Sequence, residues 1–218
     1  MDKKVMEKLS YGLFVCTAKE GNKDNGCIIN TAIQVTNTPN RVAVAINKSN
    51  FTHDMVVKTK VMNVCVISKK ADFDMFKHFG FQSGKDVDKF NVASSQWMKE
   101  NINNCKRAEN GLMYIAAGTN SYISLAVQDM IDLDSHTLFI CAVTDGAIID
   151  DSPSATYQFY HQNIKTQAEK IGTTPEGKTI WKCKICGYVY EGEDLPEDFI
   201  CPWCKHPASD FEKVSVTA

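Results

Sequence analysis

The sequence predicts a mainly β domain, a barrel or sandwich with a few inserted helices, followed by a small C-terminal metal-binding domain. The large domain is predicted by at least six short runs rich in β-branched residues and by the polar turns that separate them. The small domain is predicted by two Cys-x-x-Cys pairs near the C-terminus. Helical patterns are too few for a parallel sheet in which a helix follows each strand.

The composition restricts the class of protein. The chain has 218 residues, 44% of them hydrophobic and 23% charged, and its formal net charge is -2. A nearly balanced charge predicts no nucleic-acid partner. No apolar segment approaches the ~18 residues of a membrane span, so we expect no membrane association. The opening "MDKKVMEKLS" lacks the apolar core of a secretion signal, which predicts a cytoplasmic protein.

The strand-like runs occupy most of the first ~160 residues. In Arg41–Asn47, the apolar residues Val42, Val44 and Ile46 alternate with smaller ones, which is the period of a strand with one core face. The segments that we expect to form strands are Tyr11–Ala18, Cys27–Val35, Arg41–Asn47, Val61–Ser68, Ser121–Leu133 and His136–Ile149.

Two segments between these runs are expected to be helical. "NFTHDMVVKTK" begins at Asn50, a residue type that often caps a helix N-terminus. "DFDMFKHF" carries Phe73, Phe76 and Phe79 at helical spacing.

Nine cysteines need an explanation in a reducing compartment, where disulfides are rare. Four of them form the two C-terminal pairs, and the other five are scattered. Cys16, Cys65 and Cys141 each lie in an apolar run, so we expect them to be buried thiols without a chemical role. The remaining scattered cysteines are Cys27 and Cys105.

The two C-terminal pairs are Cys183 with Cys186, and Cys201 with Cys204, separated by 14 residues. Each pair can direct two sulfurs to one point, and two facing pairs complete a tetrahedron that suits zinc or a single iron. Spacing alone favours zinc. The aromatic residues around the pairs favour iron, because a small redox site needs an apolar shell. These residues are Trp181, Tyr188, Tyr190, Phe199, Trp203 and Phe211.

A polar segment separates the two predicted domains. "IKTQAEKIGTTPEGKT" has no apolar period and contains two glycines and a proline, so it reads as a linker that lets a second module move. We therefore expect a β domain over residues 1–165, a linker over 166–179 and a metal domain over 180–218.

The metal domain resembles the rubredoxin family. The similarity lies in "CKICGYVYEG" and "LPEDFICPWCKHPASDFE", which reproduce the C-x-x-C-G-Y-x-Y motif, a proline, the C-P-x-C pair and a closing phenylalanine. The short interval between the pairs is similar to the rubredoxin-like module of rubrerythrins. The glycine that usually follows the fourth cysteine is replaced by Lys205. The resemblance implies one iron with four cysteine ligands.

A single iron accepts one electron, whereas a hydride donor supplies two, so a flavin is expected between them. "NGCIINTAIQVTNTPNRVAVAINKSNFTHDMV", Asn25 to Val56, resembles the flavin reductase-like, FMN-binding split-barrel family, and the similarity extends over about residues 5–162. Both halves together resemble the high-molecular-weight rubredoxins. This resemblance implies a split β-barrel, a homodimer, electron flow from NAD(P)H through FMN to the iron, and an acceptor such as a flavodiiron protein.

Two segments supply the candidate FMN ligands, although an ordinary turn or a helix cap explains each residue singly. The first is expected to hold the isoalloxazine edge, with Ala32 permitting close approach. The second precedes a predicted helix, where a phosphate is favoured. The candidates are Asn30, Thr31, Ala32, Ile33 and Gln34 in the first, Asn47, Lys48, Ser49, Asn50 and Thr52 in the second, and Phe81 in a later loop.

No catalytic residue can be assigned from the sequence, and His53 is a weak candidate for proton donation. His78 is a similar candidate, and a structural role explains both histidines. Tyr157 and Tyr160 lie in a segment similar to one near the flavin of the family, but core packing explains them equally well. "GFQSGKD" is one residue too short for a phosphate loop.

Two alternatives to the NAD(P)H-dependent oxidoreductase remain open. One is an FMN-binding electron carrier that another reductase supplies, since no dinucleotide fingerprint is present. The other is a flavin reductase whose C-terminal module is a structural zinc ribbon.

Overall fold

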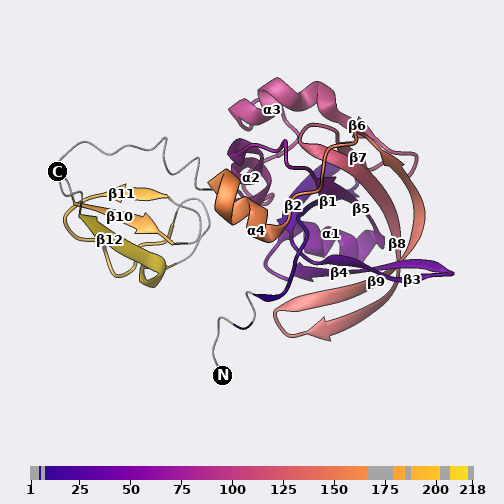
Figure 1. The fold of residues 1–218 in the computed structure, drawn as a ribbon, viewed down its shortest axis with the longest axis horizontal. Coiled ribbons are helices and arrows are strands. Elements are labelled where there is room, and N and C mark those ends of the chain that lie inside the picture. The colour runs from indigo at the N-terminus through magenta and orange to yellow at the C-terminus, as the bar shows by residue number, and fades with distance from the viewer. Residues whose placement is uncertain (1–4, 6–7, 166–178, 185–187, 202–206, 216–218) are drawn as a thin grey trace.

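The computed structural model describes residues 5, 8–165, 179–184, 188–201 and 207–215. Strands dominate the described chain, as predicted (Figure 1). The strands are β1 (Phe14–Glu20), β2 (Lys23–Ile29), β3 (Ala32–Asn37), β4 (Asn40–Asn47), β5 (Val61–Ile67), β6 (Cys105–Arg107), β7 (Met113–Ile115), β8 (Thr119–Leu133), β9 (His136–Ile148), β10 (Thr179–Cys183), β11 (Val189–Glu191) and β12 (Phe211–Ser215).

The helices are short and lie mostly between strands. They are α1 (Phe51–Thr59), α2 (Phe73–Gly80), α3 (Gln96–Asn101) and α4 (Tyr157–Phe159), which continues as a π-helix over Tyr160–Lys165; two short 3₁₀ turns cover Ile102–Asn104 and Ala208–Asp210. Over the described residues, no helix has the length and apolar character that crossing a membrane requires.

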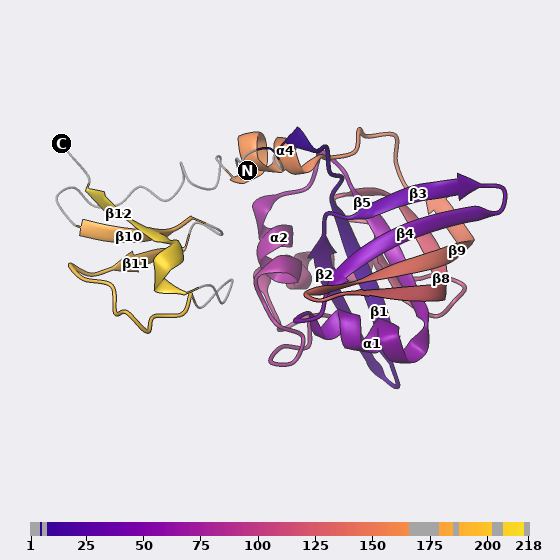
Figure 2. The same cartoon turned by 90° about the horizontal axis from the view of Figure 1, so that it is seen from below.

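Seven strands form one antiparallel sheet in the order β2-β1-β5-β8-β9-β4-β3. The two edge strands, β2 and β3, follow each other in sequence with only Asn30 and Thr31 between them. The sheet must therefore curl until its edges approach, which produces the barrel seen in Figure 2. The prediction of one strand over Cys27–Val35 is wrong, because the chain changes partner from β1 to β4 at these two residues.

The neighbouring strands β1 and β5 are buried on both faces. Cys16 and Val64 point into an interior core, whereas Val15 and Cys65 contribute to a second core on the opposite face. Successive side chains of a strand alternate between faces, so a strand covered on both sides reads as a continuous apolar run. Helices α2 and α3 and the segment 157–165 cover the outer face.

Local sequence explains two of the covering helices. The Asp72 side chain caps α2 by accepting from Met75 N at 2.8 Å, and Phe76 and Phe79 are buried as their spacing predicts. Helix α3 was not expected from the sequence. Ser95 caps it by accepting from Met98 N at 3.0 Å, and its Trp97 fills the outer core.

The C-terminal unit is a separate three-stranded sheet in the order β11-β10-β12. Both views place it beside the barrel, on the side that carries α2 and α4 (Figures 1 and 2). The predicted linker, apart from Thr179 at the start of β10, lies outside the described residues.

Candidate functional site

The C-terminal unit places one cysteine of each pair in a single small core. Cys183 and Cys201 are 1% and 0% exposed and cluster with Phe211. Cys186 and Cys204 lie outside the described residues, as do Trp203 and Lys205. With half of the predicted ligand set outside it, the described chain contains no group of three or more His, Cys, Asp or Glu side chains that could hold a metal.

Backbone contacts lie beside each described cysteine. Cys183 ends β10, and its N–H donates to the Tyr188 carbonyl oxygen at 2.8 Å. Ile200, next to Cys201 in the chain, forms an isolated antiparallel bridge with Pro207. The two described sulfurs belong to one buried cluster, as a site that draws ligands from both pairs requires.

Aromatic rings enclose this small core. The Phe199 ring lies 4.8 Å from Tyr190 and 5.4 Å from Phe211, both edge to face, and 6.3 Å from Tyr188 in a stacked arrangement. Trp181 closes the cluster and donates from Nε1 to the Glu193 carbonyl oxygen at 3.3 Å. Soft thiolates inside an apolar shell fit iron or zinc, and the shell limits water in the way that a redox metal requires.

Most of the predicted flavin ligands lie where the start of β3 meets the end of β4. Strands β3 and β4 are antiparallel, so the start of β3 lies beside the end of β4. The Ala45 N–H donates to the Thr31 carbonyl oxygen at 3.1 Å, and Thr31 Oγ1 donates to Asn30 Oδ1 at 3.0 Å. The pairing thus brings the first candidate segment next to the second. Gln34 points elsewhere and donates to Asn40 Oδ1 at 2.9 Å.

The N-terminus of α1 follows directly after β4. Asn50 occupies the N-cap position, as predicted, but its side chain makes no capping hydrogen bond. Asn47 Oδ1 accepts from the Ser49 N–H at 2.9 Å, which shapes the turn before the helix. In the first helical turn, the His53 N–H donates to the Asn50 carbonyl oxygen at 3.0 Å. The amides of Phe51 and Thr52 are therefore the ones that could bind an anion, which fits the predicted phosphate site. Lys48 is held by Asp132 at 2.6 Å, so it would have to exchange this partner to reach a phosphate.

Thr52 is buried in the first turn of α1, and Asn25 fixes it. Asn25 Nδ2 donates to Thr52 Oγ1 at 2.9 Å, and the Asn25 side-chain oxygen is buried without a hydrogen-bond partner. Asn25 could not be recognised from the sequence, because nothing in "KDNGC" distinguishes it from a turn residue. Its role depends on α1 folding back against β2.

The histidines are engaged in structural hydrogen bonds. His53 Nδ1 lies 3.1 Å from Asp54 Oδ1, and Nε2 lies 2.9 Å from Thr137 Oγ1. Burial lowers the pKa of His78 to about 4, so this imidazole is neutral at pH 7 and has no proton to give from a cationic form. The structural explanation of both side chains is therefore the better one.

The two tyrosines differ in their surroundings. Tyr160 is buried, with its ring centroid 4.4 Å from that of Phe76, so it belongs to the outer core. Tyr157 is partly exposed and stacks edge to face on Tyr11 at 6.4 Å. Core packing accounts for Tyr160, and the predicted cofactor contact of Tyr157 stays a prediction.

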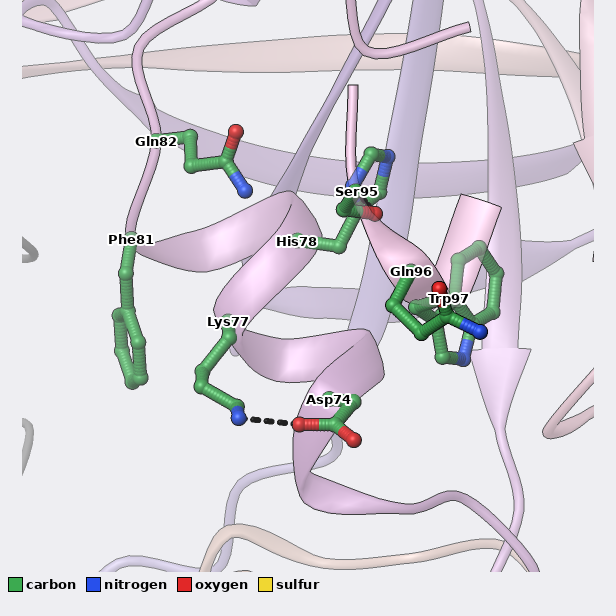
Figure 3. Close-up of a pocket in the computed structure, with 8 residues that line it drawn as sticks. All are labelled: Asp74, Lys77, His78, Phe81, Gln82, Ser95, Gln96 and Trp97. Carbon is green, nitrogen blue, oxygen red and sulfur yellow. Dashed lines mark hydrogen bonds and ion pairs between the residues drawn. The ribbon is translucent and has the colours of Figure 1, made fainter. Parts of the chain in front are cut away.

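A pocket of about 350 Å³ is lined by residues of α2, of α3 and of the connection between them (Figure 3). Lys77 and Asp74 form an ion pair on its rim. Its other lining residues are His78, Phe81, Gln82, Ser95, Gln96 and Trp97. Phe81, the last predicted flavin contact, packs against the Cys183–Cys201 core and is distant in sequence from the β3–α1 candidates.

Lys89 is a buried cation, only 2% exposed. Its Nζ donates to the carbonyl oxygens of Gly26 and Phe79, at 2.8 and 2.9 Å. Burial lowers the pKa of Lys89 to about 8. No sequence pattern indicates this buried cation, which links the end of α2 to β2.

The scattered cysteines are mostly buried, as predicted for Cys16, Cys65 and Cys141. Burial raises the pKa of Cys65 and of Cys141 to about 12. These thiols stay protonated and unreactive at neutral pH. Cys27 is also buried, and Cys105 is partly exposed with a pKa that burial raises to about 12.

Residues 6–168 match the flavin reductase like domain family, and residues 181–212 match the rubrerythrin, rubredoxin-like domain family. A high molecular weight rubredoxin of Moorella thermoacetica is 33% identical, and the alignment covers 98% of this chain and 100% of that protein. A ferric-chelate reductase (NAD(P)H) of Archaeoglobus fulgidus is 28% identical and covers 83% of this chain and 98% of its own length.

Solved structures share the barrel at lower identity. An NADH:FAD oxidoreductase of Streptomyces globisporus, in complex with NAD and FAD fragments, has a TM-score of 0.59 and 19% identity, covering 71% of this chain and 84% of that one. An FMN-binding protein of Thermus thermophilus has a TM-score of 0.55 and 16% identity, covering 86% and 85%. These two likenesses establish the fold.

Proposed function

Since the chain belongs to the flavin reductase-like family and continues into a rubredoxin-like domain, we propose that it is an oxidoreductase that passes electrons from NAD(P)H through FMN to a four-cysteine iron centre. One observation carries the proposal: a flavin-type barrel and a thiolate metal unit share one chain, and a high molecular weight rubredoxin aligns with both along its whole length. The ferric-chelate reductase relative, whose name includes NAD(P)H, supports the choice of donor.

The proposed FMN site lies where β3 starts and α1 begins. Bound FMN would accept two electrons as a hydride and release them singly. The amides of Phe51 and Thr52, with the side chains of Ser49 and Asn50, would bind its phosphate. Asn30 and Thr31 would face the polar edge of the ring, and Ala32 would leave room for it. Asn25 would hold Thr52 in place beneath the phosphate.

The proposed iron site uses Cys183, Cys186, Cys201 and Cys204. The aromatic residues around Cys183 and Cys201 would exclude water from the sulfurs and so help to set the reduction potential. The site would pass single electrons to an external acceptor, and we propose a flavodiiron protein for that role.

We also propose that the chain forms a homodimer through the outer face of β3, β4, β9 and β8. The register places Ile33 opposite Ala43, Ala43 opposite Ile140, and Ile131 opposite Leu138, so these side chains share one face. Ile33 is 64% exposed and Ile131 is 45% exposed. An apolar face of this kind favours a protein partner, and it adjoins the proposed flavin site.

The proposed function is tested by an anaerobic titration of the purified protein with NADH and with NADPH, following flavin and iron absorbance together. We expect flavin bleaching first and iron bleaching after it. Flavin bleaching without any change at the iron would contradict the relay. If neither nucleotide reduces the protein, the FMN-binding carrier replaces the enzyme, and a colourless metal site with bound zinc would establish the zinc-ribbon alternative.

A further inference from the structure

One short segment of the barrel contacts the C-terminal unit. Phe81, which ends α2, packs against the core formed by Cys183, Cys201 and Phe211. Within the described chain, all other members of that cluster come from residues 179–215. Figure 3 shows Phe81 and Trp97 on opposite sides of α2. Within the barrel, the Phe81 ring lies edge to face with that of Phe73, with 5.9 Å between the ring centroids.

The other end of the same segment contacts the first turn of α1. Lys85 Nζ lies 3.9 Å from Asp54 Oδ2. The Gly84 backbone packs directly on the side-chain amide of Asn25, which in turn holds Thr52. A residue with a side chain at position 84 would collide with that amide. The segment Phe81–Lys85 thus contacts the C-terminal unit at one end and the N-terminus of α1 at the other.

A second contact holds the C-terminal unit near this position. The buried Lys165, at the end of the π-helix, donates from Nζ to the carbonyl oxygen of Lys184 at 3.0 Å. Lys184 follows Cys183 directly, so this hydrogen bond holds the backbone beside a candidate metal ligand. Both contacts lie on the side of the barrel that carries α2 and α4 (Figure 2).

We propose that Phe81 is a positioning residue that seats the rubredoxin-like unit on the barrel, and that the segment Phe81–Lys85 is the protein path between the two cofactor sites. This inference rests on the proposed function. The Cα atoms of Phe81 and Lys85 are at most about 15 Å apart, since each trans peptide spans 3.8 Å. The seat therefore keeps the thiolate end of the unit close to the α1 N-terminus.

The electron balance determines how often the C-terminal unit must occupy its position on the barrel. One hydride carries two electrons, whereas a single bound iron would hold one at a time. Each electron would have to leave for the external acceptor protein before the next could follow, and two-electron oxidation of a bound reduced flavin would release one proton to water. The unit must therefore stay seated, or return to its seat, twice for each nucleotide oxidised.

The test compares the full-length, FMN- and iron-loaded protein with Phe81→Ala and Phe81→Leu, and with Val92→Ala as a control for loss of an exposed apolar side chain on the same connection. Small-angle X-ray scattering reports seating without any turnover. Stopped-flow absorbance after mixing with nucleotide reports the ratio of the iron rate to the flavin rate. Flavin content is measured for each variant.

We expect Phe81→Ala to enlarge the maximum dimension and to lower the ratio of iron to flavin rates by about tenfold, as loss of a partly buried phenyl contact predicts. Phe81→Leu should retain most of the ratio of iron to flavin rates and a maximum dimension close to that of the unchanged protein. Val92→Ala should match the unchanged protein in both quantities. An unchanged ratio and an unchanged dimension in Phe81→Ala would overturn the proposal.

Two other results separate this inference from those on which it depends. Loss of flavin from Phe81→Ala would overturn the seat and make Phe81 a flavin contact, as the sequence first suggested. If iron is not reduced in the unchanged protein, the proposed function fails, and the path between cofactors fails with it. The seat itself is then decided by the scattering difference alone.

Discussion

The imidazole of His78 lies buried between α2 and α3 and is held at both nitrogens. Nε2 lies 2.8 Å from the Lys89 carbonyl oxygen, which can only accept, so Nε2 carries the proton that it donates. Nδ1 lies 2.8 Å from Ser95 Oγ and accepts from that hydroxyl. The site therefore prefers the neutral ring, and burial lowers its pKa from 6.5 to about 4.

This preference makes stability depend on pH. In the unfolded chain His78 binds a proton below pH 6.5, but in the folded chain it does so only near pH 4. The free energy of unfolding should therefore fall as pH drops from 6.5 to 4, by up to about 3 kcal/mol from this residue. Urea denaturation at several pH values, compared with His78→Gln, measures the contribution. Identical pH slopes in the two proteins would contradict it.

A second prediction at this scale concerns the stability of a Gly84 variant. A Cβ at this position would meet the Asn25 amide, which cannot move without losing its bond to Thr52. We expect Gly84→Ala to lower the free energy of unfolding by about 1–3 kcal/mol, the usual cost of overpacking. Chemical denaturation measures it, with Gly80→Ala as control, because a Cβ there meets only the Ile28 side chain, at 3.2 Å.

The same collision can be tested from its other side. Asn25→Ala removes the obstructing amide, so the double variant should be more stable than the sum of the two single effects predicts. Strict additivity would show that Gly84 and Asn25 do not interact.

At the scale of elements, the uncovered outer face of β3 and its neighbours predicts the assembly state. A lysine in place of Ile33 or of Ile131 would bury a charge inside the proposed dimer. We expect either change to weaken the dimer by at least about 3 kcal/mol, a factor of 100 or more in its dissociation constant. Light scattering coupled to size-exclusion chromatography gives the mass. Val92→Lys is the matched control, and a stable dimer in Ile33→Lys would refute this interface.

The elements also show how far sequence reasoning extends. Alternation and apolar runs predicted most strands of the barrel, because strands β4, β5, β8 and β9 carry their own pattern. The Asn30–Thr31 break was missed, because only the tertiary change of partner from β1 to β4 creates it. Helix α3 was missed because its six residues are too short to show a period.

For the site, sequence motifs predicted cysteines whose described members, Cys183 and Cys201, share a buried core. The family resemblance and the polar residues of the sequence indicated two candidate flavin segments, which β3 and β4 bring together. The sequence could not predict Asn25, Gly84 or the place of Phe81, because their contacts join parts of the chain that only the fold makes neighbours. Asn50 shows the converse, since its position was predicted and its capping bond is absent.

At the scale of the whole molecule, the proposed relay makes electron delivery depend on which metal is bound. Zn²⁺ suits the same thiolates but has no redox chemistry, so zinc-loaded protein should still reduce its flavin with NAD(P)H. Electron delivery to an acceptor protein should fall by about tenfold or more because Zn²⁺ cannot relay electrons. Acceptor reduction is followed by absorbance, and reloading with iron is the control. Equal delivery by zinc and iron protein would remove the metal from the path.

The order of the strands also delays completion of the barrel while the chain is being synthesised. The β3–β4 hairpin can form early, but the second partner of β4 is β9. Val42 pairs with Cys141, almost a hundred residues later. At about 5–20 residues per second, a ribosome needs roughly 5–20 s to deliver that partner. During this interval the hairpin presents both of its apolar faces to the cell, so the order of synthesis makes this edge of the barrel the part of the nascent chain most in need of protection from aggregation.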